Sequence, residues 1–198
     1  MKKWVCVFCA STEGGSWEYM DQARVMGRGI AGRGLGLVYG GATVGTMGAV
    51  ADATLQAGGE VVGVIPEVLM ERELGHARLT ELHVVRTMHE RKALMAERAD
   101  AFVALPGGFG TLDEFIEILT WAQLRIHTKP CVLVNVLGYY DGLLEFLQTG
   151  VERGFLKREN FELIRVARDA DEALDLVERA WAEDGRGVED LRMGRLVE

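Results

Sequence analysis

Short apolar runs alternate with amphipathic helical patterns along the chain, and this alternation limits the fold more than any other feature of the sequence. Several runs, such as 61–65 and 132–134, are continuously apolar. Such runs are typical of strands in a parallel sheet that helices cover on both faces. The predicted strands are 4–8, 35–39, 60–65, 82–85, 101–105, 131–136 and 161–166.

Patterns of helical period fill the intervals between these strands. The alternation predicts a single α/β domain, a doubly wound, Rossmann-like parallel sheet of about seven strands with helices on both faces. We expect this domain to span 1–182 and 183–198 to form a charged tail that is frayed or packs on a partner chain. Residues 66–78 are expected to form a loop with a short helix. The predicted helices are 17–33, 46–57, 88–100, 111–124, 141–153 and 169–181.

Composition and charge exclude several classes of protein. With 198 residues, 48% of them hydrophobic, the chain is too apolar to be disordered and suits one domain. A formal net charge of -8 argues against general nucleic-acid binding, which needs a surplus of Lys and Arg. No apolar run approaches the roughly 18 residues of a membrane span, and the first residues lack the apolar segment of a signal peptide. We therefore expect a cytoplasmic protein with neither a membrane nor a nucleic-acid partner.

The chain has three cysteines, which cannot all pair within one molecule. Reduced, buried thiols are the expected state. Cys6 and Cys9 form one C-x-x-C pair with no second pair at ligand spacing, so the sequence predicts no metal site.

Glycine-rich turns follow three of the predicted strands. In an open parallel sheet, ligands bind beyond the carboxyl ends of the strands. Glycine lets backbone N–H groups close around an anion, and a helix N-terminus adds unpaired donors and a favourable dipole. Together the turns predict a phosphate-binding edge, although each glycine could simply make a tight turn. The turns are 9–15, 40–46 and 106–111, and the last opens directly into a helix.

Two better-known phosphate motifs do not fit. In the turn at 40–46, Thr46 and Met47 stand where a P-loop needs Lys followed by Ser or Thr. The G-x-G spacing at 32–36 precedes a strand, whereas a dinucleotide fingerprint follows one. The sequence therefore does not support nucleoside triphosphate or dinucleotide binding.

Glu114 lies one turn into the helix that follows the turn at 106–111. It either forms a capping box with Thr111 or lies at the edge of a ligand pocket. In the second position its carboxylate could stabilise a developing positive charge.

Two cations flank the inward face of the predicted helix 88–100. Met88, Met95 and Ala99 form that face, and Arg91 and Lys92 lie within roughly 60° on either side of it. A charge beside an apolar seam is costly unless an anion pairs with it, although either side chain could instead reach solvent. A guanidinium can hold a phosphate through two hydrogen bonds.

An anion cradle, a guanidinium and a carboxylate predict a pocket for a sugar phosphate or a nucleoside monophosphate. The carboxylate could support cleavage of a glycosidic bond through an oxocarbenium-like transition state. These features alone do not separate cleavage from simple nucleotide binding.

Two motifs resemble those of the LONELY GUY (LOG) family, long described as possible lysine decarboxylases. Residues 106–114, Pro-Gly-Gly-Phe-Gly-Thr-Leu-Asp-Glu, resemble its PGGxGTxxE motif, and residues 88–92, Met-His-Glu-Arg-Lys, resemble its M-x-x-R-K motif. Paired motifs in this order are highly specific. The resemblance extends from residue 5 to about residue 166, through 38–41, 45–48, 59–66, 120–124 and 138–141.

The resemblance implies hydrolysis of the N-glycosidic bond of AMP or N6-modified AMP, such as isopentenyladenosine monophosphate, to free base and ribose 5-phosphate, without cofactor or metal. Arg91 and Glu114 would be the catalytic pair. Glu114 would stabilise the ribosyl cation or position water, and Arg91 would hold the ribose phosphate region or help the base depart. The nucleotide-binding residues would be Ser11, Gly40, Gly41, Gly45, Met88, Lys92, Gly107, Gly108, Gly110 and Thr111.

A lysine decarboxylase is not expected, because a pyridoxal phosphate enzyme needs a Schiff-base lysine. Lys92, the one convincing candidate, is already assigned to the nucleotide. The resemblance also implies a homodimer or a larger assembly with the site close to the subunit interface. The helices that begin near residues 88 and 111 are apolar enough to pack against a partner.

The sequence departs from the family at three positions and leaves two rival functions open. Ala10 and Ala42 replace frequent glycines and could narrow the phosphate cradle, while Arg125 replaces a common glycine and could alter the base end or the dimer contact. The rivals are a general nucleoside monophosphate nucleosidase in base salvage and a non-hydrolytic nucleotide sensor. Retention of both Glu114 and Arg91 argues against the sensor.

Overall fold

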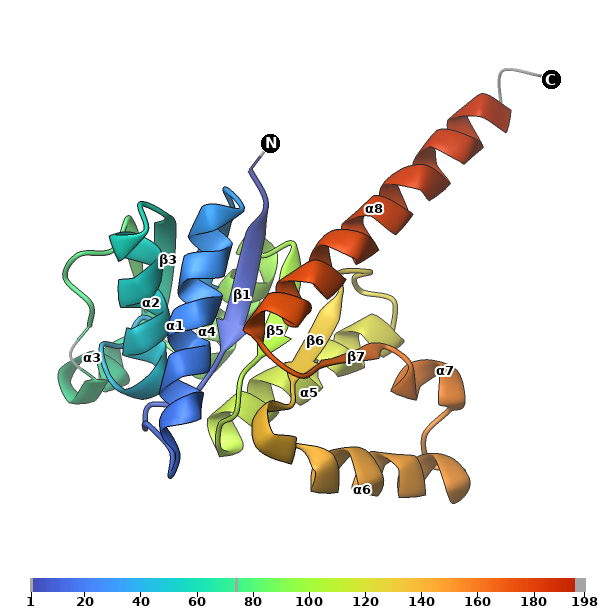
Figure 1. Ribbon diagram of the computed structural model, residues 1–198, viewed down its shortest axis with the longest axis horizontal. Coiled ribbons are helices and arrows are strands. Elements are labelled where there is room, and N and C mark those ends of the chain that lie inside the picture. The colour runs from blue at the N-terminus through green and yellow to red at the C-terminus, as the bar shows by residue number, and fades with distance from the viewer. Residues whose placement is uncertain (1, 74, 195–198) are drawn as a thin grey trace.

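One parallel sheet of seven strands organises the part of the chain that the structure describes, residues 2–73 and 75–194 of a computed structural model (Figure 1). The strand order is β4-β3-β2-β1-β5-β6-β7, and the predicted doubly wound sheet is confirmed. Because the order reverses between β1 and β5, a ligand site is expected beyond the carboxyl ends of these two strands. The strands are β1 (Trp4–Phe8), β2 (Gly36–Tyr39), β3 (Glu60–Pro66), β4 (Glu81–Val85), β5 (Ala101–Ala104), β6 (Cys131–Val134) and β7 (Ile164–Ala167).

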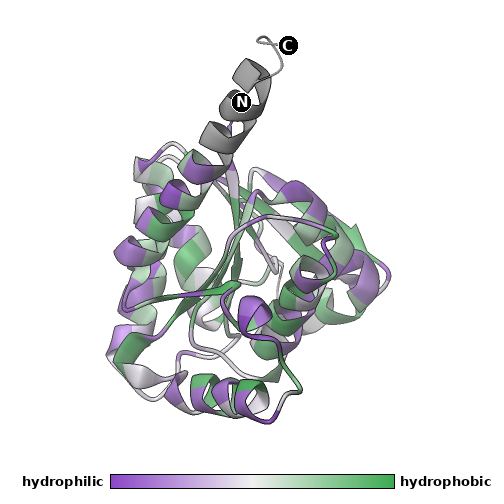
Figure 2. Ribbon diagram, turned by 90° about the vertical axis from the view of Figure 1, so that its right-hand side faces the viewer, coloured by the Kyte–Doolittle hydropathy of each residue, from purple (hydrophilic) through white to green (hydrophobic). Residues whose placement is uncertain are grey.

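Helices cover both faces of the sheet. On one face α1 (Trp17–Gly32), α2 (Gly45–Gln56) and α8 (Ala170–Gly194) share an apolar core with the strands. On the other face α4 (Met88–Arg98), α5 (Phe109–Gln123) and part of α6 (Asp141–Glu152) form a second core. In Figure 2 the strands are mostly hydrophobic and the helices mixed, as expected for a sheet buried on both sides. The shorter elements are α3 (Glu67–Glu73), the 3₁₀ turn η1 (Val136–Gly138) and α7 (Arg158–Phe161).

The structure differs from the predicted elements mainly at their ends. The predicted strand 161–166 is wrong at its start, because Phe161 ends α7 and β7 begins at Ile164. A short apolar run alone does not separate a strand from a helical turn. The predicted helix 169–181 continues as α8 to Gly194, and no proline interrupts this stretch. Residues 195–198 of the predicted tail lie outside the described residues.

Gly27 lets α1 and α2 pack closely. A Cβ at this position would overlap the carbonyl oxygen of Val50 and lie 2.9 Å from the amide nitrogen of Thr54. Both atoms belong to the backbone of α2 and cannot turn aside as a side chain can. The contact fixes the spacing of the two helices and therefore of the two glycine-rich turns that precede them.

We expect Gly27→Ala to destabilise the protein by about 1–3 kcal/mol, because the added methyl group overpacks this contact. Gly32→Ala is the matched control in the same helix, since nothing lies within 4 Å of a Cβ there. Helix propensity favours Ala over Gly, so the control should keep or gain stability. Urea unfolding of both variants beside the wild type measures the difference, and equal stabilities would contradict the close contact.

Candidate active site

A cavity of about 290 Å³ lies at the carboxyl edge of the sheet, near the reversal of strand order. A second cavity of about 230 Å³ shares Ala10, Thr12 and Gly108 with it and reaches Tyr139. The first cavity brings together many of the predicted site residues, and Gly107 lines the second. The predicted residues in the first cavity are Ser11, Gly40, Met88, Arg91, Gly108, Gly110, Thr111 and Glu114.

The first turn of α4 positions Arg91. Its N-cap is Thr87, whose hydroxyl accepts a hydrogen bond from the Glu90 amide at 3.1 Å. The Glu90 carboxylate in turn accepts one from the Arg86 amide at 2.8 Å. This cap resembles a capping box, and it fixes the start of α4 so that Arg91, one residue further on, lies on the buried face.

The Arg91 side chain, only 6% exposed, lies between the ends of β2 and β3. Its Nε donates to the Val64 carbonyl at 3.1 Å and its Nη2 to the Gly40 carbonyl at 3.0 Å. A Cβ at position 40 would overlap Nη2, so glycine is required there to admit the guanidinium. Its Nη1 lies 3.9 Å from the Met88 sulfur, and both residues line the cavity. Gly40 therefore serves the site chiefly by holding Arg91.

Met88 departs from its predicted place on the inward face of α4. It is partly exposed at the cavity, whereas Arg91, Met95, Ala96 and the following Ala99 are buried. Met88 is the first residue of the helix, where the chain has just left the sheet edge, so its side chain reaches the site and does not enter the core.

Glu114 lies in the second turn of α5, is 8% exposed and lines the same cavity as Arg91. Of the two alternatives for Glu114, the capping box with Thr111 is wrong. The N-cap of α5 is Gly108, and the helix begins at Phe109, two residues earlier than predicted. Thr111 is thus the third helical residue, and Glu114 lies too far along the helix to reach the capping amide. Glu114 is a buried carboxylate of the site and not a helix cap.

The N-terminus of α5 presents backbone donors to the cavity. Its first intrahelical bond runs from the Leu112 amide to the Gly108 carbonyl at 3.1 Å, so the amides of Phe109, Gly110 and Thr111 precede the helical ladder. Nothing lies within 4 Å of a Cβ at Gly108 or Gly110. Open amides and the helix dipole make this end of α5 suitable for a phosphate.

The N-terminus of α2, by contrast, binds the turn that follows β1. The Thr46 amide donates to the Thr12 carbonyl at 3.3 Å, and the Met47 amide to the Ala10 carbonyl at 3.1 Å. The Thr46 hydroxyl accepts from the Ala10 amide at 2.8 Å. Gly45 has φ +59°, and a Cβ there would overlap the Thr12 backbone. The turn at 40–46, predicted to be a phosphate cradle, therefore holds the turn at 9–15 in place.

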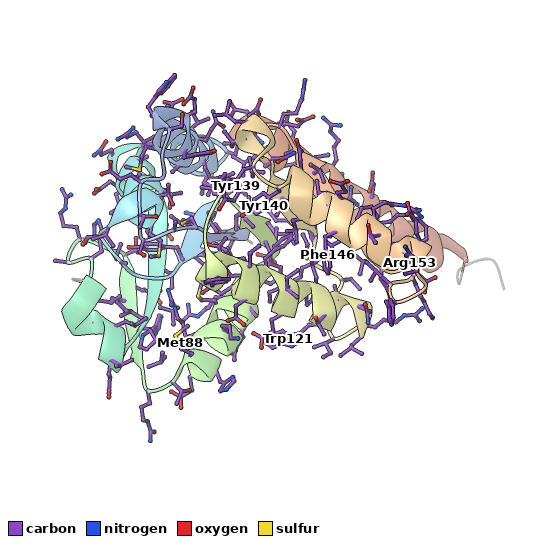
Figure 3. All side chains as sticks on the ribbon, turned by 90° about the horizontal axis from the view of Figure 1, so that it is seen from below. Met88, Trp121, Tyr139, Tyr140, Phe146 and Arg153 are labelled. Atoms are coloured by element: carbon purple, nitrogen blue, oxygen red, sulfur yellow. The ribbon has the colours of Figure 1, made fainter. Side chains whose placement is uncertain are left out.

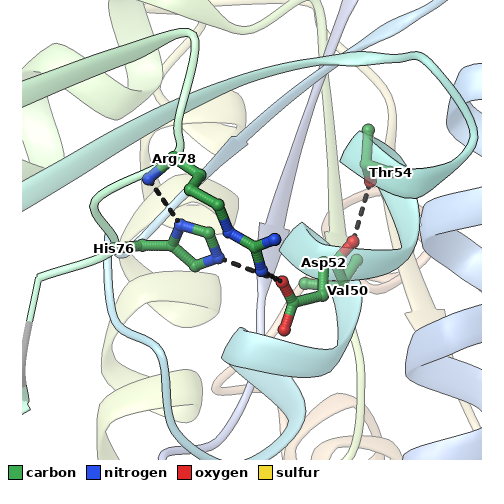
Figure 4. Close-up of polar contacts among 5 residues, drawn as sticks. All are labelled: Val50, Asp52, Thr54, His76 and Arg78. Carbon is green, nitrogen blue, oxygen red and sulfur yellow. Dashed lines mark hydrogen bonds and ion pairs between the residues drawn. The ribbon is translucent and has the colours of Figure 1, made fainter.

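Gly41 also has a structural role. It has φ +79°, and its carbonyl accepts a hydrogen bond from the His76 amide at 3.1 Å. The His76 imidazole Nε2 lies 3.3 Å from the Asp52 carboxylate, which also accepts from Arg78 at 3.0 Å (Figure 4). These bonds fasten the segment after α3 to α2 and to the end of β2, and Gly41 lies outside the cavity lining.

Lys92 lies outside both cavities. Its ammonium lies 3.1 Å from carboxylate oxygens of Asp113 and Glu117, both on α5. Burial lowers the pKa of Lys92, but its interactions with these two carboxylates outweigh that effect and raise the pKa. Arg91 and Lys92 are neighbours in sequence, yet the first enters the site while the second joins α4 to α5.

Cys9, Thr46 and Tyr139 belong to the site region although sequence reasoning assigned them no role. Cys9 lines the cavity, and burial, followed by the nearby charge of Glu114, raises its pKa from 9.0 to about 12. A thiol with this pKa is protonated at neutral pH and is a poor nucleophile. The only sequence signals for these residues were their places in the turn after β1 and in the motifs 45–48 and 138–141.

Among the described residues, no group of three His, Cys, Asp or Glu side chains is placed to hold a metal ion. The helices of this part of the chain include none that combines the length and apolar character needed to cross a bilayer.

Curated proteins are closely similar over most of the chain. It is 47% identical over 174 residues to the cytokinin riboside 5'-monophosphate phosphoribohydrolase LOG3 of Arabidopsis thaliana, covering 88% of this chain and 81% of that protein. It is 50% identical over 173 residues to a protein of the same description from Rhodococcoides fascians, covering 87% of both chains. The chain belongs to the LONELY GUY (LOG) family. The family described as possible lysine decarboxylase also matches it, over residues 47–177.

Solved structures share the fold of this LOG family chain. The molybdenum cofactor carrier protein of Chlamydomonas reinhardtii matches with a TM-score of 0.70 at 24% identity, covering 92% of this chain and 99% of that one. The molybdenum cofactor binding protein of Rippkaea orientalis matches with a TM-score of 0.68 at 19% identity, covering 90% and 97%. At these identities the likeness shows the Rossmann-like fold alone.

The three departures from the LOG family pattern are accommodated locally. The backbone of Ala10 carries the bonds to Thr46 and Met47 described above. Ala42 is buried and forms an antiparallel bridge with Gly75. Arg125 has φ +59° and follows the C-cap of α5, where its amide donates to the Ala122 carbonyl at 2.9 Å. Glycine is usual at this position of a helix end.

Buried thiols make the stability of the fold sensitive to alkaline pH. Burial raises the pKa of Cys131, as of Cys9, from 9.0 to about 12. As the pH rises, these thiols therefore lose their protons in the unfolded chain before they do so in the folded protein. The stability that the buried, protonated thiols contribute is complete below pH 9 and is lost between pH 9 and 12. Each thiol should cost about 1.4 kcal/mol of stability at pH 10.

Urea unfolding at pH 8 and pH 10 checks this expectation. Between these two conditions, Cys131→Ala should lose about 1.4 kcal/mol less stability than the wild type loses. Equal losses in the two proteins would show that burial does not raise the pKa of Cys131.

Proposed function

We propose that the chain hydrolyses the N-glycosidic bond of AMP and N6-modified AMP to free base and ribose 5-phosphate. The observation that carries this proposal is the enclosure of Arg91 and Glu114 in one cavity with the open N-terminus of α5. It is supported by relatives that are 46–50% identical and bear the name cytokinin riboside 5'-monophosphate phosphoribohydrolase.

In this proposal, different residues of the cavity bind the phosphate and support bond cleavage. The amides of Phe109, Gly110 and Thr111 hold the phosphate, which places the ribose beside Glu114. As the bond between C1′ and the base nitrogen breaks, its electron pair leaves with the base and positive charge develops on the ribose. The Glu114 carboxylate stabilises that charge and orients the water whose oxygen bonds to C1′. The proton released by the water ends on the departing base.

Arg91 supplies a fixed positive charge at the opposite wall. Two of its N–H groups are engaged by Val64 and Gly40, and a guanidinium has five. The remaining donors serve the ribose phosphate region or the departing base. Because the carbonyls hold the guanidinium before substrate arrives, little reorganisation is needed during the reaction.

Lysine decarboxylation is not supported by the site. The lysines of the chain are Lys2, Lys3, Lys92, Lys129 and Lys157, and none is among the described residues that line the two cavities. A Schiff-base lysine would have to face the ligand. The older family description therefore does not match this chemistry.

We propose a homodimer with the site close to the interface. Along α5, Phe109 is 94% exposed and Leu124 is 61% exposed, and Phe146 on α6 is 70% exposed. Large apolar side chains exposed on two helices favour an interaction surface there. We also propose a cytoplasmic location, which suits three buried cysteines present as free thiols.

Glu114→Ala should abolish base release from both AMP and isopentenyladenosine monophosphate while the protein stays folded, because Glu114 does not cap α5. Asp113→Asn is the matched control, since the neighbouring carboxylate faces Lys92 outside the cavity. Chromatography of released base measures both variants. Wild-type rates in Glu114→Ala would refute the mechanism, and the wild-type ratio between the two substrates decides between cytokinin activation and base salvage.

Arg91→Ala should raise KM and lower kcat for AMP together, because the same guanidinium serves binding and bond cleavage. Arg98→Ala is the control on the same helix, where the side chain is exposed and pairs with Glu81. Steady-state kinetics with circular dichroism as a check of folding make the comparison. Unchanged kinetic constants in Arg91→Ala would remove this residue from the site.

A further inference from the structure

Two adjacent tyrosines hold the loop that leads into α5. The Tyr139 hydroxyl donates to the Gly107 carbonyl at 2.8 Å, and the Tyr140 hydroxyl donates to the Leu105 carbonyl at 2.7 Å. The two carbonyls flank Pro106. Figure 3 shows the tyrosines side by side where the chain enters α6. The loop is thus fixed from a separate element, 32 and 35 residues away in sequence.

The bond from Tyr139 determines how the next amide is oriented. The Gly107 carbonyl and the Gly108 N–H belong to one planar peptide, and in a trans peptide they point in opposite directions. When Tyr139 holds the carbonyl on its own side, the Gly108 N–H is turned away from Tyr139. Gly108 lines the cavity of Arg91 and Glu114 as well as the cavity of Tyr139. A Gly108 N–H turned away from Tyr139 can donate into the first of these cavities, which Phe109, Gly110 and Thr111 of the α5 N-terminus also line.

A tight turn after β6 delivers both tyrosines. Leu137 has φ +53° and Gly138 has φ +71°, and the left-handed conformation of Leu137 costs on the order of a kcal/mol or more. Asn135 closes the turn, because its side chain donates to Asp141 at 2.6 Å and accepts from the Tyr140 amide at 2.7 Å. A strained turn that several bonds hold in place is more typical of a functional element than of a plain connection.

The two tyrosines have different surroundings. Tyr140 is buried in the second core, whereas Tyr139 is partly exposed and lines the second cavity. The Tyr139 ring stands edge-on to Tyr19, with centroids 5.8 Å apart, and to Tyr140, at 4.9 Å. The Tyr139 hydroxyl is therefore at the site, while Tyr140 attaches the same loop to the core.

We propose that Tyr139 is a positioning residue that aims the Gly108 amide at the phosphate of the substrate. The proposal rests on the proposed function, in which that phosphate lies at the α5 N-terminus. Without the hydroxyl the Gly107 peptide can rotate, and the cavity loses one oriented donor. Arg91 and Glu114 are untouched, so the loss falls on the ribose phosphate half of the ligand and spares the base.

Calorimetric titration of Tyr139→Phe with ribose 5-phosphate and, separately, with adenine tests this proposal. We expect the Kd for ribose 5-phosphate to rise about fivefold to tenfold, as for one lost hydrogen bond, and the Kd for adenine to stay at the wild-type value. The KM for AMP should rise by a similar factor with a smaller change in kcat. Unchanged affinity for ribose 5-phosphate would overturn the proposal, and so would an equal loss for both ligands, which would indicate a general structural role.

Tyr39→Phe is the matched control. It also removes a tyrosine hydroxyl, one that is buried in the first core and has no hydrogen-bond partner among the described residues. Its affinities for both ligands should equal those of the wild type. Base release by the wild type distinguishes the two proposals. If the wild type releases no base from AMP, the proposed function is contradicted. If the wild type releases base and Tyr139→Phe binds ribose 5-phosphate normally, only the role of Tyr139 is contradicted.

Discussion

The burial of one guanidinium underlies the arrangement of the whole site. A buried charge is costly unless hydrogen bonds satisfy it, and Arg91 meets that requirement through the carbonyls at the ends of β2 and β3. The arrangement needs a glycine at position 40 and a firmly capped start of α4. Because these strands end at the carboxyl edge of the sheet, the positive charge is fixed at the edge where ligands bind in open parallel sheets.

Helix α5 supplies the other part of the cavity lining. Helix α5 brings a buried carboxylate and open backbone amides to the same cavity, and the two tyrosines after β6 hold the loop that leads into it. In the proposed function, the phosphate, the ribose and the base are therefore held by different groups, each fixed by the fold before a ligand binds. The amides at the N-terminus of α2 are bonded to the turn after β1 and keep that turn against the cavity.

Local pattern was sufficient to predict the fold and the main charged residues of the site. Continuously apolar strands predicted the parallel sheet, and the motifs 88–92 and 106–114 led to Arg91, Glu114 and the α5 turn. The sequence pattern could not predict which glycine-rich turn leaves its backbone amides available to bind an anion. That depends on bonds such as Thr46 to Ala10, which join segments 36 residues apart. Likewise, only the packing of α4 on α5 separates Lys92 from its neighbour Arg91.

A crystal structure of the Glu114→Ala variant with AMP bound tests the central claim most directly. The account predicts phosphate oxygens within about 3 Å of the amides at the start of α5, and the ribose C1′ facing the space that the Glu114 side chain leaves. A phosphate bound at the turn 40–46, or a nucleotide outside the cavity lined by Arg91, would contradict it.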